Sequence, residues 1–547
     1  MNKVASYLQS HLSGEVVVNE SVLRHFSTDA SVLSIKPQLV VYPRTTNDIR
    51  KVARFAWQLA ERGHGLSVTA RGNGSDMTGA SLGNGMIVAM AAHMNRILEI
   101  DTKQKLVRLQ PGLNFKSLQE TLNTHGLFLP PQPESYDYST VGGAIANNSR
   151  SLRSYVYGSM MDWVDQLEVV LANGEAIQTG ALSKKEVSKK LGLTTLEGEL
   201  YRAVDAVLND GDEVLSSYYG SVRSAVDALG VDLTRVQQKG GGLDLTSLFI
   251  GTQGIFGIVT EAIVRVSAYQ PDASMIVVGF RSIEDAYDAS QKISNLNPSM
   301  VDVVDGDFYD FAAKHHGFEL PDELKIDGGT PAAVLFIETN EPSDKKRSKF
   351  IKKATKALGE YSEAIVSSDD FDEREKLWSY RQVTALMANY TQGGKAATTA
   401  VSSVSVPSET LHQFISSTKE LATKHRVEIS VWAHMQSGIV KLLPQFDLSK
   451  LGDRQRLLKF LDEYYGSVVK LQGSICAEGN AGRLQAPYMK KQIPTEALEL
   501  FAQIKKACDP HNILNTGTLV DVDSKKLVDN LRKDFSLDHF ADYMPRL

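Results

Sequence analysis

Cysteine is scarce in this sequence, and its scarcity excludes several kinds of site. The 547 residues include two cysteines, Cys476 and Cys508, which are far from any CxxC spacing. A disulfide framework, or an iron–sulfur cluster held by cysteines of this chain, needs more of them. The usage suits a reducing compartment.

Long apolar runs and an excess of basic residues are also missing. No stretch is apolar enough to span a bilayer, and the first 18 residues, "MNKVASYLQSHLSGEVVV", lack the apolar core of a signal peptide. We therefore expect a cytoplasmic protein, with peripheral contact to the inner face of the membrane as the alternative. The net charge of −6 argues against nucleic acid as a partner, because nucleic-acid binders carry a basic surface.

The composition that remains is that of a globular chain with more than one core. Hydrophobic residues make up 42% and charged residues 23%, both ordinary values. A chain of this length is too long for a single core, so two or three domains are expected.

The first half alternates short strands and helices, which is typical of a mixed α/β or α+β domain. Val40 and Val41 lie in a short strand, Asn47 is the expected N-cap of an amphipathic helix, and "LSVTA" is a second strand. The segment "DQLEVVLANGEAI" predicts a hairpin that turns at Asn173 and Gly174. Residues 181–245 interrupt this pattern with more charge and more helix formers.

A glycine-rich loop, "TARGNGSDMTGA", follows the second strand. It lacks the Lys-Ser/Thr ending of a P-loop and the spacing of a Rossmann fingerprint. The remaining phosphate-binding interpretation is a loop between strands, whose N–H groups and hydroxyls wrap a pyrophosphate. On the loop alone, a tight surface turn is an equally good interpretation.

The composition changes after "YQPDAS", which places a domain boundary at 270–275. Strands such as "MIVVGF" and "AAVLFIET" then alternate with helices, indicating an antiparallel sheet flanked by helices. Near the end, Leu527, Leu531 and Phe535 share one face of a predicted helix, which we expect to pack on the protein's own surface, with membrane docking as the alternative.

Further motifs follow the loop in order: "QPGLNFKSLQETL", "FLPPQPESYDYSTVGGAIANNS", "YGSMMDWVDQLEVVLANGE" and "LFIGTQGIFGIVTEAIVRV". Together they resemble the FAD-binding domain of the vanillyl-alcohol oxidase / p-cresol methylhydroxylase superfamily, in the branch of D-lactate dehydrogenase, glycolate oxidase and D-2-hydroxyglutarate dehydrogenase. The resemblance implies an α+β fold: a two-part FAD-binding domain with an α+β cap domain. The implied boundaries are 1–272 for the FAD-binding domain with an insertion at about 181–245, 273–470 for the cap, 471–520 for a segment returning to the flavin, and 521–547 for a tail.

The resemblance also implies which residues contact FAD. The first loop supplies Arg71, Gly72, Asn73, Gly74, Ser75, Asp76, Gly79 and Ala80; the second stretch supplies Pro131, Ser139, Thr140, Val141, Gly142, Gly143, Asn147, Asn148 and Ser149; and Ile258, Val259 and Asn515 add further contacts. Asn73 replaces a family glycine, and we expect it to tolerate φ > 0. The first loop has no histidine to tether the cofactor, so we expect non-covalent FAD.

The second half resembles a cap domain that handles a hydroxy acid. The helix "KLWSYRQVTALM" would supply Arg381 as the carboxylate-binding cation, with a surface arginine as the alternative. His434 matches a family histidine and would be the base, with a strand histidine satisfied by a hydroxyl or carbonyl as the alternative. Lys441 and Gly479 stand where metal-using relatives carry histidines, so His434 and Glu478 remain as ligands and we expect no metal. Lys441 would then contribute charge.

The predicted function is an FAD-dependent oxidoreductase that transfers a hydride from a small hydroxy acid, such as a D-lactate-like 2-hydroxy acid, or a related alcohol, to flavin. Two alternatives stay open: an enzyme like alkyl-dihydroxyacetone-phosphate synthase, and a flavin-binding protein with an altered cap. The electron acceptor would be a quinone, an electron-transfer protein or oxygen.

Overall fold

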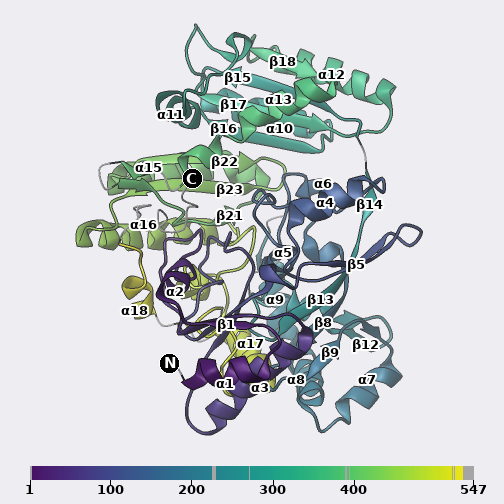
Figure 1. Cartoon of the computed structure of the whole chain (residues 1–547). Helices are drawn as coiled ribbons and strands as arrows, with labels where there is room; N and C mark the ends of the chain where they lie inside the picture. The colour runs from purple at the N-terminus through teal and green to yellow at the C-terminus, as the bar shows by residue number, and fades with distance from the viewer. Residues whose placement is uncertain are drawn as a thin grey trace, which may run out of the picture. The chain divides into compact units, whose positions relative to one another are not determined.

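The computed structural model describes residues 3–223, 230–269, 271–388, 391–392, 395–519, 522 and 524–533. The chain forms two compact units (Figure 1). The first contains the residues up to Tyr269 together with Ser474–Leu527, and the second contains the intervening residues up to Gly473 and those from Val528 onward.

A small sheet carries the glycine-rich loop of the first unit. Its strand order is β1 (Glu15–Val17), β2 (Leu39–Tyr42), β4 (Met86–Ala89), β3 (Val68–Arg71), with β2, β4 and β3 parallel and β1 antiparallel. Helix α3 (Thr46–Glu61) follows β2, and the glycine-rich loop lies between β3 and β4. The predicted succession of strand, helix, strand and loop is confirmed. The N-cap prediction is wrong: Thr45, and not Asn47, accepts the N–H of Asp48, so the helix begins earlier.

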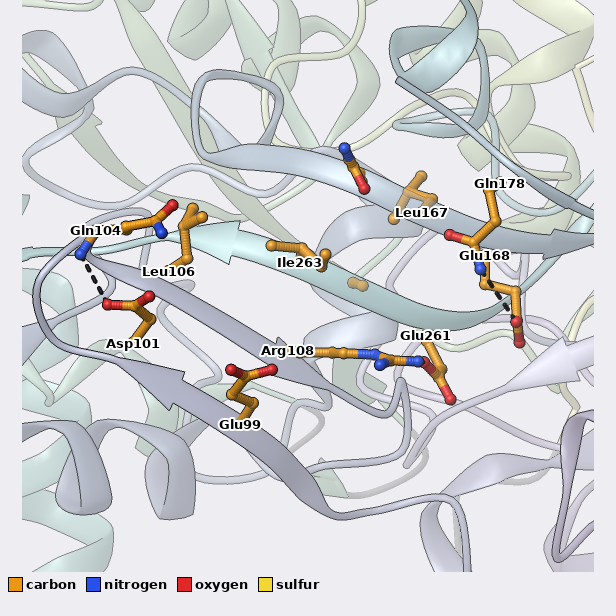
Figure 2. A pocket seen from close by; sticks show the side chains of 12 residues that line it. Glu99, Asp101, Gln104, Leu106, Arg108, Leu167, Glu168, Gln178, Glu261 and Ile263 are labelled. Atoms are coloured by element: carbon orange, nitrogen blue, oxygen red, sulfur yellow. Dashed lines mark hydrogen bonds and ion pairs between the residues drawn. The ribbon is translucent and has the colours of Figure 1, made fainter. Parts of the chain in front are cut away.

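A second, antiparallel sheet has the order β5 (Ile97–Asp101), β6 (Leu106–Leu109), β13 (Ile258–Arg265), β8 (Val164–Val170), β9 (Ala176–Gln178). Gly174 turns the predicted β8–β9 hairpin with φ of 84°, which confirms it. Figure 2 shows the hollow on the polar face of this sheet, where Arg108 pairs with Glu261. Val107 and Leu109 point to the opposite, buried face, the alternation typical of an antiparallel sheet with one solvated side.

The other elements of the first unit connect or cover these sheets. They are α1 (Lys3–His11), α2 (Glu20–His25), α4 (Phe115–Asn123), β7 (Leu127–Phe128), α5 (Val141–Asn147), α6 (Ser154–Tyr157), β10 (Ala181–Leu182), α7 (Lys184–Leu191), α8 (Leu196–Asp210), α9 (Asp212–Ser221), β11 (Gln237–Gln238), β12 (Gly242–Asp244), β14 (Ser267–Ala268) and α17 (Thr495–Cys508). Helices α7 to α9 and strands β10 to β12 make up the helix-rich interruption of the strand pattern, and α17 packs on α8.

The second unit is built on one antiparallel sheet, as predicted. The order is β18 (Ile365–Ser368), β15 (Ser274–Phe280), β17 (Ala333–Thr339), β16 (Met300–Asp305), β22 (Ile429–His434), β23 (Ile439–Phe446), β20 (Lys395–Ala397), β19 (Thr391–Gln392), with β21 (Ser403–Ser405) also pairing with β23. Its helices are α10 (Ile283–Ser294), α11 (Asp307–His316), α12 (Asp344–Leu358), α13 (Phe371–Arg381), α14 (Thr384–Met387), α15 (Leu411–His425) and α16 (Leu451–Lys470).

The C-terminal helix is shorter than predicted. Helix α18 (Ser524–Asp529) ends before Leu531, although Leu527 and Leu531 are both buried, and Phe535 lies outside the described residues. Within the ranges that the structure describes, no helix is long and apolar enough to cross a membrane.

Candidate functional site

The glycine-rich loop packs against the start of α5. A Cβ added at Gly72 would lie 2.2 Å from Thr140 Oγ1, so a larger residue does not fit there. Gly74 supplies the left-handed turn with φ of 78°, and Ser75 Oγ lies 3.0 Å from Ser139 Oγ. The fold therefore brings together the first loop and the second stretch, two of the segments predicted to hold FAD.

Asn73 does not have the predicted positive φ. It is absent from the residues with positive φ in the described chain, and the adjacent Gly74 makes the turn instead. The Asn73 side chain donates from Nδ2 to the backbone oxygen of Tyr138 at 2.9 Å, a second tie between loop and second stretch.

Arg71 fastens the loop to the N-terminal segment. It is 4% exposed, and its guanidinium donates to the backbone oxygens of Phe26 and Thr28 at 3.4 and 2.8 Å. Burial lowers the pKa of Arg71, while the neighbouring carboxylates of Asp29 and Asp76 act in the opposite direction. These contacts give Arg71 an anchoring role, and its contact with a phosphate stays a prediction.

Asp76 closes the loop from inside. Its carboxylate accepts hydrogen bonds from the backbone N–H groups of Thr78 and Ala80 at 3.0 and 2.8 Å, and from Asn147 Nδ2 at 3.1 Å. Gly79, with φ of 75°, completes this turn beside Leu33, which a Cβ at Gly79 would approach to 2.6 Å.

The second stretch begins with a capped helix and ends at a cleft. Thr140 caps α5 by accepting the N–H of Gly143, and a Cβ at Gly142 would lie 2.4 Å from Pro111 Cβ. Val141, Pro131 and Ser139 are buried around this start, and Ser149 follows the helix, half-buried. Asn148 ends α5 with φ of 50°.

A cleft in the first unit joins the end of α5 to the C-terminal segment. It is lined on one side by Asn147, Asn148 and Arg150, and on another by Gly251, Gly479 and Asn480. Glu478 lies between two cleft residues, Ala477 and Gly479. Gly479 has φ of 102°, so a histidine in the same conformation at this position would be strained.

The segment after residue 474 returns to the glycine-rich loop. Asn515, with φ of 40°, donates from Nδ2 to the backbone oxygens of Ala80 and Gln253 at 3.0 and 2.6 Å. Arg483 donates to the backbone oxygens of Leu82 and Thr516, and burial lowers its pKa to about 10. Ile258 and Val259 open β13 opposite Val170 and Val169.

These features fit a flavin dinucleotide. Glycine backbone without room for side chains at positions 72 and 142 permits close approach, and the hydroxyl groups of Ser75 and Ser139 lie together at the loop. The Asn147 and Asn148 amides at the cleft offer donors and acceptors of the kind that flavin ring heteroatoms need.

A buried charged cluster lies on one sheet face of the second unit. Asp302 on β16 accepts a hydrogen bond from Arg381 Nε at 2.7 Å and one from His434 Nδ1 at 2.5 Å. Asp302 is 1% exposed, and Arg381 and His434 are each 3% exposed. Burial alone would raise the pKa of Asp302, but its charge interactions and hydrogen bonds with His434 and Arg381 outweigh burial and hold that pKa below its usual value.

One of the alternative interpretations of the predicted cap residues is wrong. Arg381 stands at the last turn of α13 but is buried and ion-paired, so it is not a surface arginine. His434 is a strand histidine whose Nδ1 lies against the carboxylate of Asp302, a partner that the prediction did not name. Lys441 is 2% exposed on β23, opposite Trp432, with its ammonium 5.8 Å from the centre of the indole ring.

The two residues that remain of the metal ligands of related proteins fall in different units. His434 belongs to the second unit and Glu478 to the first. Among the residues that the structure describes, no group of three His, Cys, Asp or Glu side chains is placed to hold a metal ion.

The sequence-based prediction missed Asp302, which holds both Arg381 and His434. A signal was present, because the strand "MVDVVD" places Asp302 and Asp305 among apolar residues, and buried carboxylates are rare unless paired. It also missed Gln253, which is buried between Gly251 and Gly254, two glycines with positive φ.

Known structures share this fold. The chain is similar to p-cresol methylhydroxylase with substrate bound, with a TM-score of 0.67 and 16% identity, covering 96% of this chain and 97% of that one. It is also similar to the 4-ethylphenol oxidase of Gulosibacter chungangensis, with a TM-score of 0.65 and 17% identity over 95% and 97% of the two chains. The chain is also similar to an alkyldihydroxyacetonephosphate synthase structure, with a TM-score of 0.63 and 15% identity, covering 94% of this chain and 86% of that one. The fold is thus that of the p-cresol methylhydroxylase type, which confirms the predicted fold class.

Two family profiles complete the assignment. The FAD binding domain family matches residues 37–180, and the family of C-terminal domains of FAD linked oxidases matches residues 270–519. The chain belongs to the FAD-linked oxidases of the p-cresol methylhydroxylase-type superfamily. It is therefore an FAD-dependent oxidoreductase, as predicted.

Curated relatives agree at low identity. Glycolate oxidase subunit GlcD of Bacillus subtilis is 27% identical over 495 residues, which cover 90% of this chain and 91% of that protein. D-2-hydroxyglutarate dehydrogenase of Escherichia coli is 24% identical over 532 residues, which cover 95% of this chain and 52% of that protein. D-lactate dehydrogenase of Archaeoglobus fulgidus is 22% identical over 482 residues, covering 88% and 91%. The chain spans about half the length of the D-2-hydroxyglutarate dehydrogenases that it matches.

Proposed function

We propose that this protein oxidises a small 2-hydroxy acid, or a related alcohol, and passes a hydride to FAD. The observation that carries the proposal is the buried cluster of Asp302, His434 and Arg381. It lies in the region matched by the FAD-linked oxidase C-terminal family, and the relatives include a glycolate oxidase component and D-lactate dehydrogenases.

The cluster contains the groups that such a reaction needs. The guanidinium of Arg381 would bind the substrate carboxylate, because its planar fork matches a carboxylate. Asp302 accepts a hydrogen bond from Nδ1 of His434, so Nε2 of the neutral ring carries the lone pair and would take the hydroxyl proton. The buried ammonium of Lys441 would add positive charge on the same sheet face.

The first unit would hold the cofactor. Bound FAD supplies the acceptor for the hydride that leaves the substrate carbon. The glycine-rich loop would hold its pyrophosphate, and Asn147, Asn148 and the second stretch would bind the ring system. We propose that the attachment is non-covalent, since the loop at 71–80 has no histidine. Glu478 beside the cleft stays a candidate for contact with the substrate.

The overall reaction would convert a 2-hydroxy acid to a 2-oxo acid, with the proton on His434 released to solvent. The electrons would leave through a quinone, an electron-transfer protein or oxygen. We place the protein in the cytoplasm, with peripheral membrane contact as the route to a quinone.

Anaerobic mixing of the holoprotein with a panel of D- and L-2-hydroxy acids, alditols and aldehydes tests the proposal. Loss of the flavin absorption band with one hydroxy acid supports it. Arg381→Met should slow that reduction at least tenfold, because the carboxylate loses its cation. Arg374→Met, on the same helix and outside the cluster, is the matched control.

Two results would contradict the proposal. If light reduces the flavin but no compound of the panel does, the result favours a flavin-binding protein with an altered cap. Exchange of an acyl for an alkyl group without net flavin reduction would favour the synthase-like alternative.

A further inference from the structure

Gln253 lies where separate segments of the first unit meet, in a conformation that few non-glycine residues adopt. Its φ is 53° and it is 5% exposed. Its backbone N–H donates to Ala146 O at 2.9 Å, and its backbone oxygen accepts from Asn515 Nδ2 at 2.6 Å. A strained conformation of this kind persists only where the surroundings fix it, and it is found most often at functional sites.

The Gln253 side chain joins three segments. Nε2 donates to Asn147 Oδ1 at 2.9 Å and to Thr78 Oγ1 at 3.2 Å, and Oε1 accepts from the backbone N–H of Gly482 at 2.9 Å. These partners lie 106, 175 and 229 positions away in the chain. They belong to the end of α5, the glycine-rich loop and the C-terminal segment, the three regions predicted to surround FAD.

The direction of these hydrogen bonds is determined by Asp76. Its carboxylate accepts from Asn147 Nδ2 at 3.1 Å and from Thr78 Oγ1 at 2.9 Å. Asn147 must therefore turn its oxygen, and Thr78 its lone pair, toward Gln253. Only a donor group suits that position, and an amide provides it while still accepting from Gly482.

We propose that Gln253 is a positioning residue for FAD. It holds the glycine-rich loop, the end of α5 and the C-terminal segment in the arrangement that binds the cofactor, and so sets the affinity for FAD without contacting substrate. This role does not depend on which compound the enzyme oxidises.

The test is the FAD affinity of Gln253→Glu across pH. An ionised glutamate still accepts from Gly482 but presents an acceptor to Asn147 Oδ1, so at pH 8 the Kd for FAD should rise about tenfold or more. At pH 5.5 a protonated acid can donate again, and the difference from the unchanged protein should shrink. Kd is measured by quenching of flavin fluorescence on titration with deflavinated protein.

Gln104→Glu is the matched control, because it adds the same charge in the exposed β5–β6 turn (Figure 2). Its Kd should follow that of the unchanged protein at both pH values. Equal affinity of Gln253→Glu and the unchanged protein at pH 8 would overturn the proposal. If the glutamate variant does not fold, Gln253→Met, which has a similar length and no hydrogen bonds, should fold and bind FAD weakly. Loss of folding in both variants would show a role in the fold as a whole and would also overturn it.

Discussion

Replacing Asp302 by asparagine should destabilise the second unit strongly. The change removes the negative charge beside the buried guanidinium of Arg381, and the amide keeps one accepting oxygen where the carboxylate accepts from both Arg381 Nε and His434 Nδ1. Removing one partner of a buried ion pair typically costs about 3–5 kcal/mol. An exposed carboxylate such as Asp288, on α10, has no such role, and Asp288→Asn should change stability by less than about 0.5 kcal/mol.

The pH dependence gives the prediction a sign. The pKa of Asp302 in the folded protein is below its usual value, so the carboxylate contributes stability above about pH 4. That contribution is lost as the pH falls through the folded pKa. The difference between the unchanged protein and Asp302→Asn should therefore be full at pH 7 and should shrink in strong acid.

Hydrogen exchange read by mass spectrometry suits this measurement, since a chain of two units need not unfold in one step. Peptides covering β16 and β22 report the local free energy of opening, and peptides from β5 and β6 in the first unit serve as an internal reference. A double substitution, Asp302→Leu with Arg381→Met, should cost less than Asp302→Asn alone, because neither member of the Asp302–Arg381 ion pair is left buried without the other. A loss below about 1 kcal/mol for Asp302→Asn at pH 7 would refute the electrostatic reasoning.

Three further outcomes are expected. Burial raises the pKa of Asp305 to about 6, so between about pH 4 and 6 the folded state holds a proton that the unfolded state has lost. The free energy of unfolding therefore falls by about 3 kcal/mol as the pH rises through that window. Asp305→Asn should remove this decline, which urea unfolding at several pH values measures. Gly72→Ala should abolish FAD retention on purification, because the added Cβ would lie 2.2 Å from Thr140 Oγ1. The ratio of flavin absorbance to protein absorbance measures the retained cofactor. Gly220→Ala, where a Cβ would meet open space, should keep the cofactor. His434→Gln should slow anaerobic flavin reduction by at least a hundredfold while FAD affinity stays unchanged.

Local sequence signals predicted the elements of the fold well. The strands and the glycine-rich loop around 68–80 and the hairpin at Gly174 depend on neighbouring residues, which a sequence shows directly. The N-cap failed because Thr45 and Asn47 are both good caps, and the choice depends on which side chain reaches an N–H. The conformation of Asn73 was also wrongly predicted, because the neighbouring Gly74 adopts positive φ with less steric strain than an asparagine would have.

The polar partners could not be predicted in this way. Asp302 is 132 positions from His434 and 79 from Arg381, and no periodicity in one sequence connects them. The burial of Arg381 at the end of a polar helix is likewise a tertiary property, because the sequence of α13 is typical of a surface helix. The FAD contacts and the catalytic roles assigned by resemblance stay predictions.

The return of the C-terminal segment to the glycine-rich loop has a consequence for biosynthesis. Asn515 Nδ2 closes on Ala80 from 435 positions further along the chain, and Arg483 reaches Leu82 across 401. A ribosome must therefore translate the chain as far as residues 483 and 515 before these bonds can form. A nascent chain that stalls before residue 483 would therefore lack the contacts that the C-terminal segment makes with the region around the glycine-rich loop.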